Sequence, residues 1–571
     1  MRKVTITYLL IFVLSGLTVL LALNRFGYPT IGIDDANIFF VYANNLANGF
    51  GFVYNIGGEK VEGFTSLLWT IICALVFKLS PYPELTLLLI NTALIALGAT
   101  VAMTCLKSLS FSTGNSHQAN SLLWPSICLV FVFSAPAYVT WTSITLMENG
   151  LWSTLLLIAS VVVIKDNTSS QRINYWFIPL SIGLLLTRPE SFLWVPLFIF
   201  SIFFRRMLVN GGVEALKAIT PSLIVYVLIV FLLSFLRLKY FGFPLPNTYY
   251  AKVSPSPFYN IIGGSKYLFR YFRSDLIVCV SILSVVFTSI HAISTLVKKR
   301  CVEDGFMFLP LFAIIGLSVP LLSGGDHFGS FRFYQNIYPI LLLCLIYWID
   351  SILPQYILLE WKPGLHRNAR IAFVGILVAC FVLIQTPNWI TFKLKSRLAH
   401  DFDLAEDGRK KGEFIRDMFS DLTGLPSLGV IASGGTKYTY PGEVIDLLGL
   451  NNTKMAHNRG ERYGIKNHAA FEKKTFYELK PTIVCPKKVN ENEWEYNENA
   501  LQNSLAYVVL RYVFDERSFS EMYTYAKIRR KDLQINKALV GWFSRDFLKN
   551  SADLNVFDIK TYDYTVERVK N

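Results

Sequence analysis

Long runs of apolar residues separated by short polar segments dominate the first two thirds of the chain. A transmembrane helix needs roughly 20 mostly apolar residues to cross the hydrocarbon core of a bilayer. The first such run is 1–23, and further apolar segments lie at 85–106, 121–139, 149–164, 175–187, 191–204, 218–236, 275–297, 306–322, 333–353 and 371–389. This pattern predicts a polytopic α-helical membrane domain with about eleven spans.

The apolar stretch at 66–79 is short, and runs of this length are more often re-entrant or interfacial than spanning. If it does not cross, all loops on one side of the membrane are basic; they contain Lys107, then Lys165 and Arg172, then Arg205, Arg206 and Lys217, then Lys298, Lys299 and Arg300, then Lys362, Arg367 and Arg370. If it does cross, two of these clusters move outside, against the positive-inside rule. We therefore expect an embedded helix at 66–79, within a first outer loop at 24–84.

The chain becomes far more polar after residue 389, and strand-like runs at 428–432 and 482–485 alternate there with helix-like stretches. The sequence thus predicts a membrane domain over 1–389 and a soluble α/β or α+β domain over 390–571, on the outer face. At the other end, Arg2 and Lys3 precede the first apolar run and no small-residue cleavage pattern follows it. We expect this run to remain as a signal anchor.

Composition excludes an ordinary soluble enzyme and a disordered chain, since 53% of the 571 residues are hydrophobic, only 16% are charged and mean hydropathy is +0.41. The formal net charge is +14, but the basic residues punctuate apolar runs and form no stripe with aromatic residues. They indicate membrane orientation, with no nucleic-acid partner. The eight cysteines include no CxxC pair, so neither a zinc site nor a disulfide framework is supported.

Two adjacent carboxylates, Asp34 and Asp35, follow the first span directly. Apolar surroundings and a like-charged neighbour raise the pKa of such a group, which suits it to take a proton from a sugar hydroxyl. The alternative is that an aspartate only caps the helix that begins near Ala36.

Other polar groups fall on the same outer face, although they come from distant parts of the chain. The candidates for sugar binding are Asn37, Tyr54, Lys60, Glu62, Glu148, Glu190, Asn247, Tyr250 and Asp326, and those for phosphate binding are Arg188, Lys252, His327 and Arg332. Ionisable residues at the ends of spans tend to mark a site. Snorkelling, structural pairing such as Arg188 with Glu190, or contact with anionic lipids are the alternatives. A divalent cation held by Asp34, Asp35, Glu148 and Asp326 stays open, because no spacing specifies a metal.

Several of these residues lie in motifs that resemble one known family, the terminal arabinofuranosyltransferases of the GT-C glycosyltransferase superfamily. The segments that carry the resemblance are 34–36, 42–55, 61–69, 187–190, 246–252, 324–327 with 331–333, and 444–450. They are spread over most of the chain.

The resemblance implies an integral membrane enzyme that takes a sugar from a polyprenyl-phosphate donor and adds it, with inversion, to an envelope glycan or a lipid-linked acceptor. It implies an active site on the periplasmic face of a bacterial cytoplasmic membrane. A carboxylate of the acid pair matches the family's catalytic base, with Asp34 favoured as the base and Asp35 as its partner or as a donor-sugar ligand. The embedded helix would form one wall of the donor-lipid groove, and the soluble domain would contact the acceptor.

Two other functions remain as alternatives from different classes. A transporter or flippase of lipid-linked sugars should place its ionisable groups near the membrane midplane, on interrupted helices and often in repeated halves. Here the candidate groups cluster at one surface and no repeat is visible. A non-catalytic envelope scaffold predicts that Asp34 and Asp35 can be replaced without loss of function.

Overall fold

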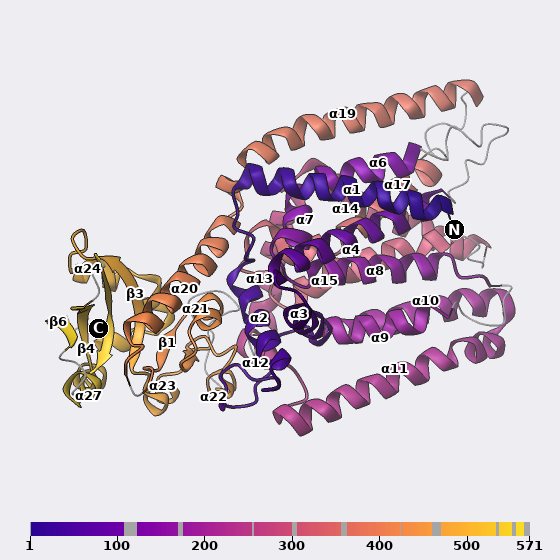
Figure 1. The fold of residues 1–571 in the computed structure, drawn as a ribbon. Helices are drawn as coiled ribbons and strands as arrows, with labels where there is room; N and C mark the ends of the chain where they lie inside the picture. The colour runs from indigo at the N-terminus through magenta and orange to yellow at the C-terminus, as the bar shows by residue number, and fades with distance from the viewer. Residues whose placement is uncertain are drawn as a thin grey trace.

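The computed structural model of the chain consists of a helical bundle with a sheet domain at one of its ends (Figure 1). It describes residues 2–107, 123–168, 175–253, 256–299, 305–353, 355, 363–422, 424–458, 470–532, 536–550 and 556–564. The bundle helices lie side by side, with their ends directed toward or away from the sheet domain (Figure 1).

Six helices among the described residues are long and apolar enough to cross a membrane. They are α1 (Arg2–Phe26), α4 (Pro83–Leu106), α10 (Ser191–Asn210), α11 (Gly212–Phe241), α14 (Leu276–Lys299), and α15 (Leu309–Leu322) with the preceding η2 (Gly305–Phe308). Two bent helix pairs raise the number to eight if each pair is one span. The multi-pass helical architecture predicted from the sequence is confirmed, but the described residues contain six to eight such spans instead of eleven.

The difference lies mainly in helices that are apolar but short. α8 (Asn149–Ile164) has 16 residues and α9 (Phe177–Thr187) has 11. At about 1.5 Å per residue, a helix as short as α9 reaches only about half of the roughly 30 Å apolar core. The last predicted span, 371–389, lies within α19 (Pro363–Lys395).

Proline accompanies both bends. The first pair is α6 (Leu123–Ser134) followed by α7 (Pro136–Val139) and η1 (Thr140–Ile144), bent by 73°. The second pair is η3 (Gly329–Phe331) and α16 (Arg332–Gln335) followed by α17 (Tyr338–Tyr347) and η4 (Trp348–Ile352), bent by 65°. Pro136 and Pro339 stand in the first turns after the breaks, where a residue without an N–H group is tolerated.

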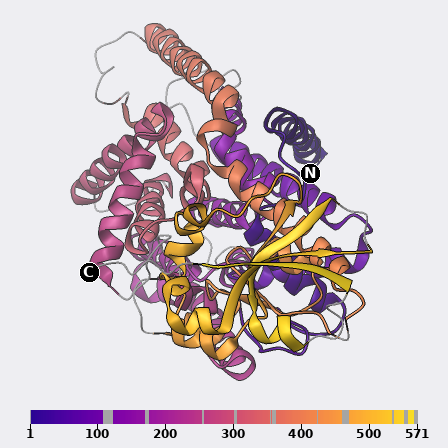
Figure 2. The same ribbon diagram turned by 90° about the vertical axis from the view of Figure 1, so that its left-hand side faces the viewer.

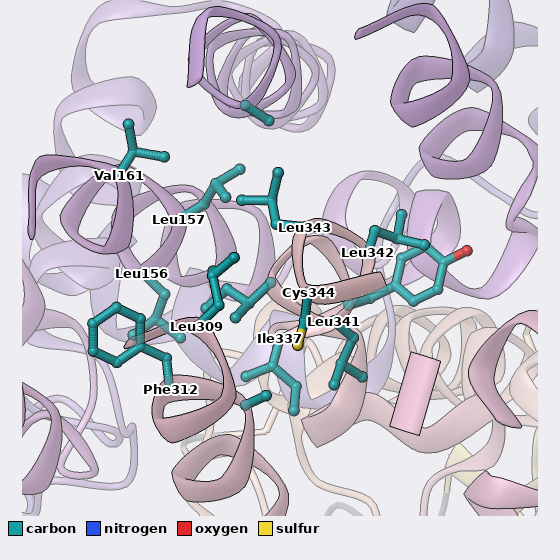
Figure 3. Packing of buried hydrophobic residues seen from close by; sticks show 14 of the residues in the cluster. Leu156, Leu157, Val161, Leu309, Phe312, Ile337, Leu341, Leu342, Leu343 and Cys344 are labelled. Atoms are coloured by element: carbon teal, nitrogen blue, oxygen red, sulfur yellow. The ribbon is translucent and has the colours of Figure 1, made fainter. Parts of the chain in front are cut away.

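Close packing of apolar side chains holds the centre of the bundle together. Leu156 of α8, Phe312 of α15 and Leu341 of α17 are fully buried and belong to one continuous cluster (Figure 3). Each fully buried side chain of this size contributes roughly 1.5 to 3 kcal/mol relative to its exposed state in water. The cluster gives the site at the bundle end a rigid support.

Short helices lie between the bundle and the sheet domain (Figure 1). They are α2 (Asp34–Ala47), α3 (Leu67–Leu79), α12 (Asn247–Lys252) and α13 (Pro257–Phe272). The stretch predicted to form a short embedded helix at 66–79 is indeed helical, and the Ser66 hydroxyl caps α3 by accepting a hydrogen bond from the N–H of Trp69. Its position in a membrane stays a prediction.

The C-terminal part begins with α20 (Leu398–Met418) and forms one six-stranded sheet, in the order β2-β1-β3-β5-β4-β6 (Figure 2). The strands are β1 (Leu428–Val430), β2 (Val444–Asp446), β3 (Ile483–Asn490), β4 (Tyr523–Arg530), β5 (Lys537–Ser544) and β6 (Phe557–Tyr562). β1 is parallel to β2 and β3, and the other pairings are antiparallel. The predicted strand-containing C-terminal domain is confirmed, and the domain boundary at 389 stays a prediction.

The helices of the sheet domain are short. They are α21 (Gly434–Thr439), α22 (Thr453–Ala456), α23 (Lys473–Leu479), α24 (Glu498–Gln502), α25 (Leu505–Val509), η5 (Val513–Asp515), α26 (Arg517–Met522) and α27 (Arg545–Asn550). Among them, α21 packs against both α20 and α2, and thereby connects the domain to the first loop.

The C-terminal ends of α8 and α10 lie at the bundle end away from the sheet domain (Figure 1), and described basic residues stand there. Lys165 donates to the carbonyl oxygen of Thr104, and Arg205 donates to that of Ile164, so the ends of α4, α8 and α10 lie together there. Arg206 forms a buried two-point ion pair with Asp166, with N···O distances of 2.7 and 2.8 Å. Arg172, Arg300 and Lys362 lie outside the described residues.

Candidate active site

A pocket of about 670 Å³ lies between the bundle end and the sheet domain. Its lining comes from the start of α2, the segment before α16, one face of α20, the ends of β1 and β2, the middle of β3 and the start of α25. Ligand sites of this kind typically measure about 300 to 1,000 Å³. The charged and histidine side chains in the lining are Asp34, Asp35, His327, Arg397, His400, Asp401, Lys411, Asp446 and Lys487.

Asp34 occupies the first position of α2, and the sheet domain binds its carboxylate. One oxygen accepts the N–H of Gly434 at 3.1 Å and the other accepts the N–H of Gly435 at 2.8 Å. Burial raises the pKa of Asp34 to about 6, although the two N–H groups act in the opposite direction. The carboxylate is therefore mostly ionised at neutral pH and yet has a much higher proton affinity than an ordinary aspartate.

Asp35 faces two cations from separate parts of the chain. Its Oδ2 lies 3.4 Å from Nζ of Lys252, at the end of α12, and 3.6 Å from Nη1 of Arg332, at the start of α16. These distances are longer than those of a tight charge-assisted hydrogen bond. Lys252 and Arg332 thus converge on one carboxylate without being fully engaged by it.

Arg332 is held in place by Asp326 and by aromatic rings. Its Nε lies 2.7 Å from Oδ2 of Asp326, and its guanidinium carbon lies 4.5 Å from the ring centre of Phe328 and 4.9 Å from that of Phe333. Burial alone would raise the pKa of Asp326, but Arg332 and the adjacent His327 outweigh it and hold that pKa well below its usual range. Asp326 therefore acts as a permanent counter-ion that positions Arg332.

A second buried charge cluster lies behind the first. Arg188, at the end of α9, is bound by Glu190 through Nε and Nη2, at 3.1 and 2.7 Å, and also forms an ion pair with Glu148. The guanidinium groups of Arg188 and Arg332 both contact the ring of Phe333, with their carbons 5.4 and 4.9 Å from its centre. Arg188, Glu148 and Glu190 do not line the pocket, and Arg188 is already paired with both glutamates.

Three residues predicted to bind sugar instead connect the first loops to the rest of the chain. The side chain of Asn37 contacts Arg409 of α20 at 2.7 Å, and the hydroxyl of Tyr54 donates to the carbonyl oxygen of Ser433 at 2.8 Å. The amide of Asn247 donates to the carbonyl oxygens that follow β2, at Gly449 and Leu450. All three lie outside the pocket lining.

Three further sugar-binding candidates lie outside the pocket lining, as Lys252, Asp326 and Arg332 also do, and their role in sugar binding stays a prediction. Glu62 forms a buried two-point ion pair with Arg237 of α11 at 2.9 and 3.1 Å. The exposed Lys60 lies 4.9 Å from the ring centre of Tyr240, and Tyr250 packs against His457 with ring centres 4.0 Å apart. None of these residues lines the pocket.

The structure adds pocket residues that the sequence analysis did not single out, above all Asp401 and Lys411 of α20. Burial, followed by the charges of Asp35 and Asp326, raises the pKa of Asp401 to about 8, so its carboxyl group is mostly neutral at pH 7. A usable signal was present, because His400, Leu404 and Lys411 recur at helical spacing on one face of α20.

The four carboxylates considered for a divalent cation do not come together in this structure. Glu148 and Asp326 each bind an arginine, and Asp34 binds two backbone N–H groups. Among the residues with described positions, no group of three or more His, Cys, Asp or Glu side chains is arranged to hold a metal.

Comparison with known proteins gives a likeness of overall fold only. No protein-family model and no curated protein matches the chain. A crystal structure of ArnT from Cupriavidus metallidurans bound to undecaprenyl phosphate matches with 10% identity and a TM-score of 0.48, over 93% of this chain and 97% of that one.

An oligosaccharyltransferase of Archaeoglobus fulgidus, in a complex with zinc and sulfate, matches over 96% of this chain and 75% of its own, with 10% identity and a TM-score of 0.48. AglB from the same organism, with an inhibitory peptide and a dolichol phosphate, covers 93% and 75% with 10% identity and a TM-score of 0.46. Neither a family nor an activity follows from matches at this level, so the arabinofuranosyltransferase resemblance stays a prediction.

The contact between Asp34 and Gly434 makes a prediction about domain docking. A Cβ atom at Gly434 would collide with the main-chain oxygen of Asp34. We expect Gly434→Ala to destabilise the docked sheet domain by about 1 to 3 kcal/mol, measured as faster proteolysis between the two parts of the purified protein. Gly424→Ala is the control, because nothing lies within 4 Å of its new methyl group. Equal proteolysis of the two variants would contradict the prediction.

Proposed function

We propose that this protein is a GT-C membrane glycosyltransferase that uses a polyprenyl-phosphate sugar as donor. One observation carries the proposal: at one end of a membrane bundle, a single pocket brings together a carboxylate with raised proton affinity, Asp34, and a second carboxylate, Asp35, that faces Lys252 and Arg332. A base on one side of a sugar and cations for a departing phosphate on the other are what inverting transfer requires.

In this proposal Asp34 is the general base. It takes the proton of an acceptor hydroxyl, whose oxygen forms the new bond to the anomeric carbon while the bond from that carbon to the phosphate oxygen breaks. The proton ends on Asp34 and the negative charge on the leaving polyprenyl phosphate. Lys252 and Arg332 stabilise that charge, the first as a point charge and the second through its planar fork of donors.

The two aspartates take different roles for a physical reason. Asp35 lies 3.4 and 3.6 Å from the two cations, which favours its ionised form and places it on the side of the leaving phosphate. Asp34 is the group whose pKa, about 6, lies close to a working pH. Asp35 then orients the cations or binds the donor sugar. His327 lines the pocket beside Arg332, and Arg188 supports Arg332 through Phe333.

The proposal extends to membrane side and donor sugar. We place the pocket and the sheet domain on the periplasmic face of a bacterial cytoplasmic membrane, because the basic loop residues lie at the other end of the bundle. The resemblance of the sequence motifs supports a furanose such as arabinofuranose as the transferred sugar, and an envelope polysaccharide or lipopolysaccharide-type glycolipid as the acceptor.

The decisive experiment compares cells that lack the protein, cells that carry it, and cells with an equally abundant Asp34→Asn, Asp35→Asn form. Polyprenyl-phosphate sugars and envelope glycans are measured by mass spectrometry. We expect one donor to accumulate and one glycan to lose a sugar in both the null and the double-variant cells, which also identifies the donor. A double variant that behaves like the intact protein would leave the acid pair as a helix cap only.

The two bent helix pairs favour a second candidate function, a transporter or flippase of lipid-linked sugars. Interrupted helices are typical of transporters, and here two helix pairs bend by 73° and 65°. A flippase for lipid-linked sugars would move the donor across the membrane but would not form a new glycosidic bond. In vesicles with the donor and the acceptor on the same side, a flippase would therefore give no sugar transfer. Sugar transfer in such vesicles separates the two functions.

A further inference from the structure

The sheet domain contributes two lysines of its own to the pocket. Lys411 comes from α20 and Lys487 from β3, and the thiol of Cys485 is electrostatically coupled to both ammonium groups. Neither lysine belongs to the cation pair that faces Asp35. Lys252 and Arg332 contact the lining residue Asp35 but do not line the pocket themselves, whereas Lys411 and Lys487 line it directly.

A β-bulge in β3 places three residues of this strand at the wall of the pocket. Val484 pairs with Trp542 and Lys487 pairs with Val540, so Cys485 and Pro486 together oppose the single residue Gly541. This is a β-bulge, and Cys485 has a left-handed φ of 50°. Bulges re-aim side chains and are common beside active sites. Here Cys485, Pro486 and Lys487 all line the pocket.

The described residues leave the two ammonium groups without a close counter-ion. No described carboxylate lies within 4.0 Å of either Nζ, although Lys411 is partly buried. Burial lowers the pKa of Lys411, against the attraction of Asp34. A buried charge without a partner is costly, so a bound anion at this position would be favourable.

The acidic groups of the pocket are engaged elsewhere. Asp34 accepts two backbone N–H groups and Asp35 faces Lys252 and Arg332. Asp446 accepts the N–H of Leu448 and two donors of Asn451 within its own turn. Burial, followed by the charges of Asp35 and Asp326, raises the pKa of Asp401 to about 8, so it is mostly protonated at neutral pH. None of these described carboxylates forms an ion pair with either lysine, although Asp34 attracts Lys411 at longer range.

We propose that Lys411 and Lys487 bind an anionic group of the acceptor, either a phosphate ester or a carboxylate. The inference rests on the proposed transferase function, because it assigns the donor phosphate to Lys252 and Arg332 and leaves the sheet-domain wall to the acceptor. A neutral acceptor glycan would leave the partly buried Lys411 without a close counter-ion, while the exposed Lys487 would add a second charge at the mouth of the same wall. The acceptor class is therefore an acidic saccharide or a phosphorylated glycolipid.

Equilibrium dialysis of the full-length protein in lipid nanodiscs tests the proposal without any transfer reaction. The radiolabelled probes are glucuronate, glucose 6-phosphate and neutral glucose, so the first two distinguish a carboxylate from a phosphate. We expect at least one anionic probe to bind measurably more tightly than glucose. We expect Lys411→Gln, Lys487→Gln to weaken that binding at least about tenfold, as expected for lost charge-assisted contacts.

A matched control is available one residue away on each element. Lys410→Gln, Lys488→Gln removes the same two charges from α20 and β3, but Lys410 pairs with Glu406 and Lys488 lies over the ring of Phe414, both outside the pocket lining. It should bind like the wild type, and both double variants should show the wild-type unfolding temperature. The single variant Lys411→Gln replaces the test variant if that one unfolds.

Three outcomes would overturn the proposal: equal binding by the two double variants, no difference between anionic and neutral probes, or anion binding abolished only by Lys252→Gln. Each of these can occur while the Asp34→Asn, Asp35→Asn cells still accumulate a donor, so the transferase function would stand. Conversely, loss of anion binding in the Lys411→Gln, Lys487→Gln protein would be measured even if those cells showed no defect.

Discussion

Replacement of Asp34 by Asn should lower the rate of sugar transfer by roughly a hundredfold to ten-thousandfold, the usual contribution of a general base. Asn keeps the size of the side chain but cannot take a proton. The measurement is transfer in membrane vesicles, using the donor that accumulates in cells lacking the protein. Asp35→Asn should reduce the rate by raising KM for the donor, because it acts on the cations and not on the acceptor proton.

The raised pKa of Asp34 predicts how the rate of sugar transfer depends on pH. Burial raises the pKa of Asp34 to about 6, so the carboxylate that acts as a base is present above that pH and is lost below it. The wild-type rate should therefore rise with pH and level off above about 6, falling about tenfold per unit on the acid side. The residual rate of Asp34→Asn should lack this rise.

Asn55→Ala is the matched control for the structural part of this change. The Asn55 side chain also makes two hydrogen bonds between the first loop and the sheet domain, donating to the carbonyl oxygen of Val444 at 2.9 Å and accepting its N–H at 3.0 Å. It lies outside the pocket lining. Asn55→Ala should keep most of the activity, and an equally large loss in both variants would reduce Asp34 to a docking residue.

Arg332→Gln should produce the second large effect, in stability as well as in activity. Asp326 would remain buried and ionised without its partner at 2.7 Å. Removing one member of a buried pair costs about 3 to 5 kcal/mol of unfolding free energy. Thermal unfolding of the purified protein in detergent should show this loss. Transfer should fall as well, because the leaving phosphate loses its two-pronged donor.

A double variant separates these two effects. In Arg332→Gln, Asp326→Asn the uncompensated charge is gone, so most of the stability should return. Transfer should stay low, because the guanidinium that faces Asp35 is still missing. If stability and transfer return together, Arg332 contributes to the fold and has no direct role at the phosphate.

Hydropathy and loop charge predicted that Asp35, Lys252 and the segment with Asp326 and Arg332 share one face, although these three parts lie far apart in the chain. The structure brings them into contact there. Which ionisable groups of that face pair with one another was not predicted. Among the described residues, fewer helices than predicted are long enough to span, because an apolar run does not fix the length of the helix that it forms, as the 11-residue α9 illustrates.

The roles of Asn37, Tyr54 and Asn247 could not be predicted in the same way. Amide and hydroxyl groups suit a sugar and a backbone carbonyl equally well, and only the docked sheet domain reveals that Ser433, Gly449 and Leu450 are the partners. Asp401 and Lys411 escaped notice for a related reason. They belong to a polar helix, where charged residues are the norm, so the helical spacing that places Lys411 on one face with His400 and Leu404 does not by itself show that this face meets a pocket.

The two N–H groups that hold Asp34 have an evolutionary consequence. Proton affinity at position 34 depends on main-chain donors some four hundred positions later in the chain, so neither segment can drift independently of the other. A larger side chain at 434 would push the domain away, and a residue at 34 without a carboxylate would leave at least one of the two donors without its present acceptor. Across related sequences, substitutions at 34, 434 and 435 should therefore arise together or not at all.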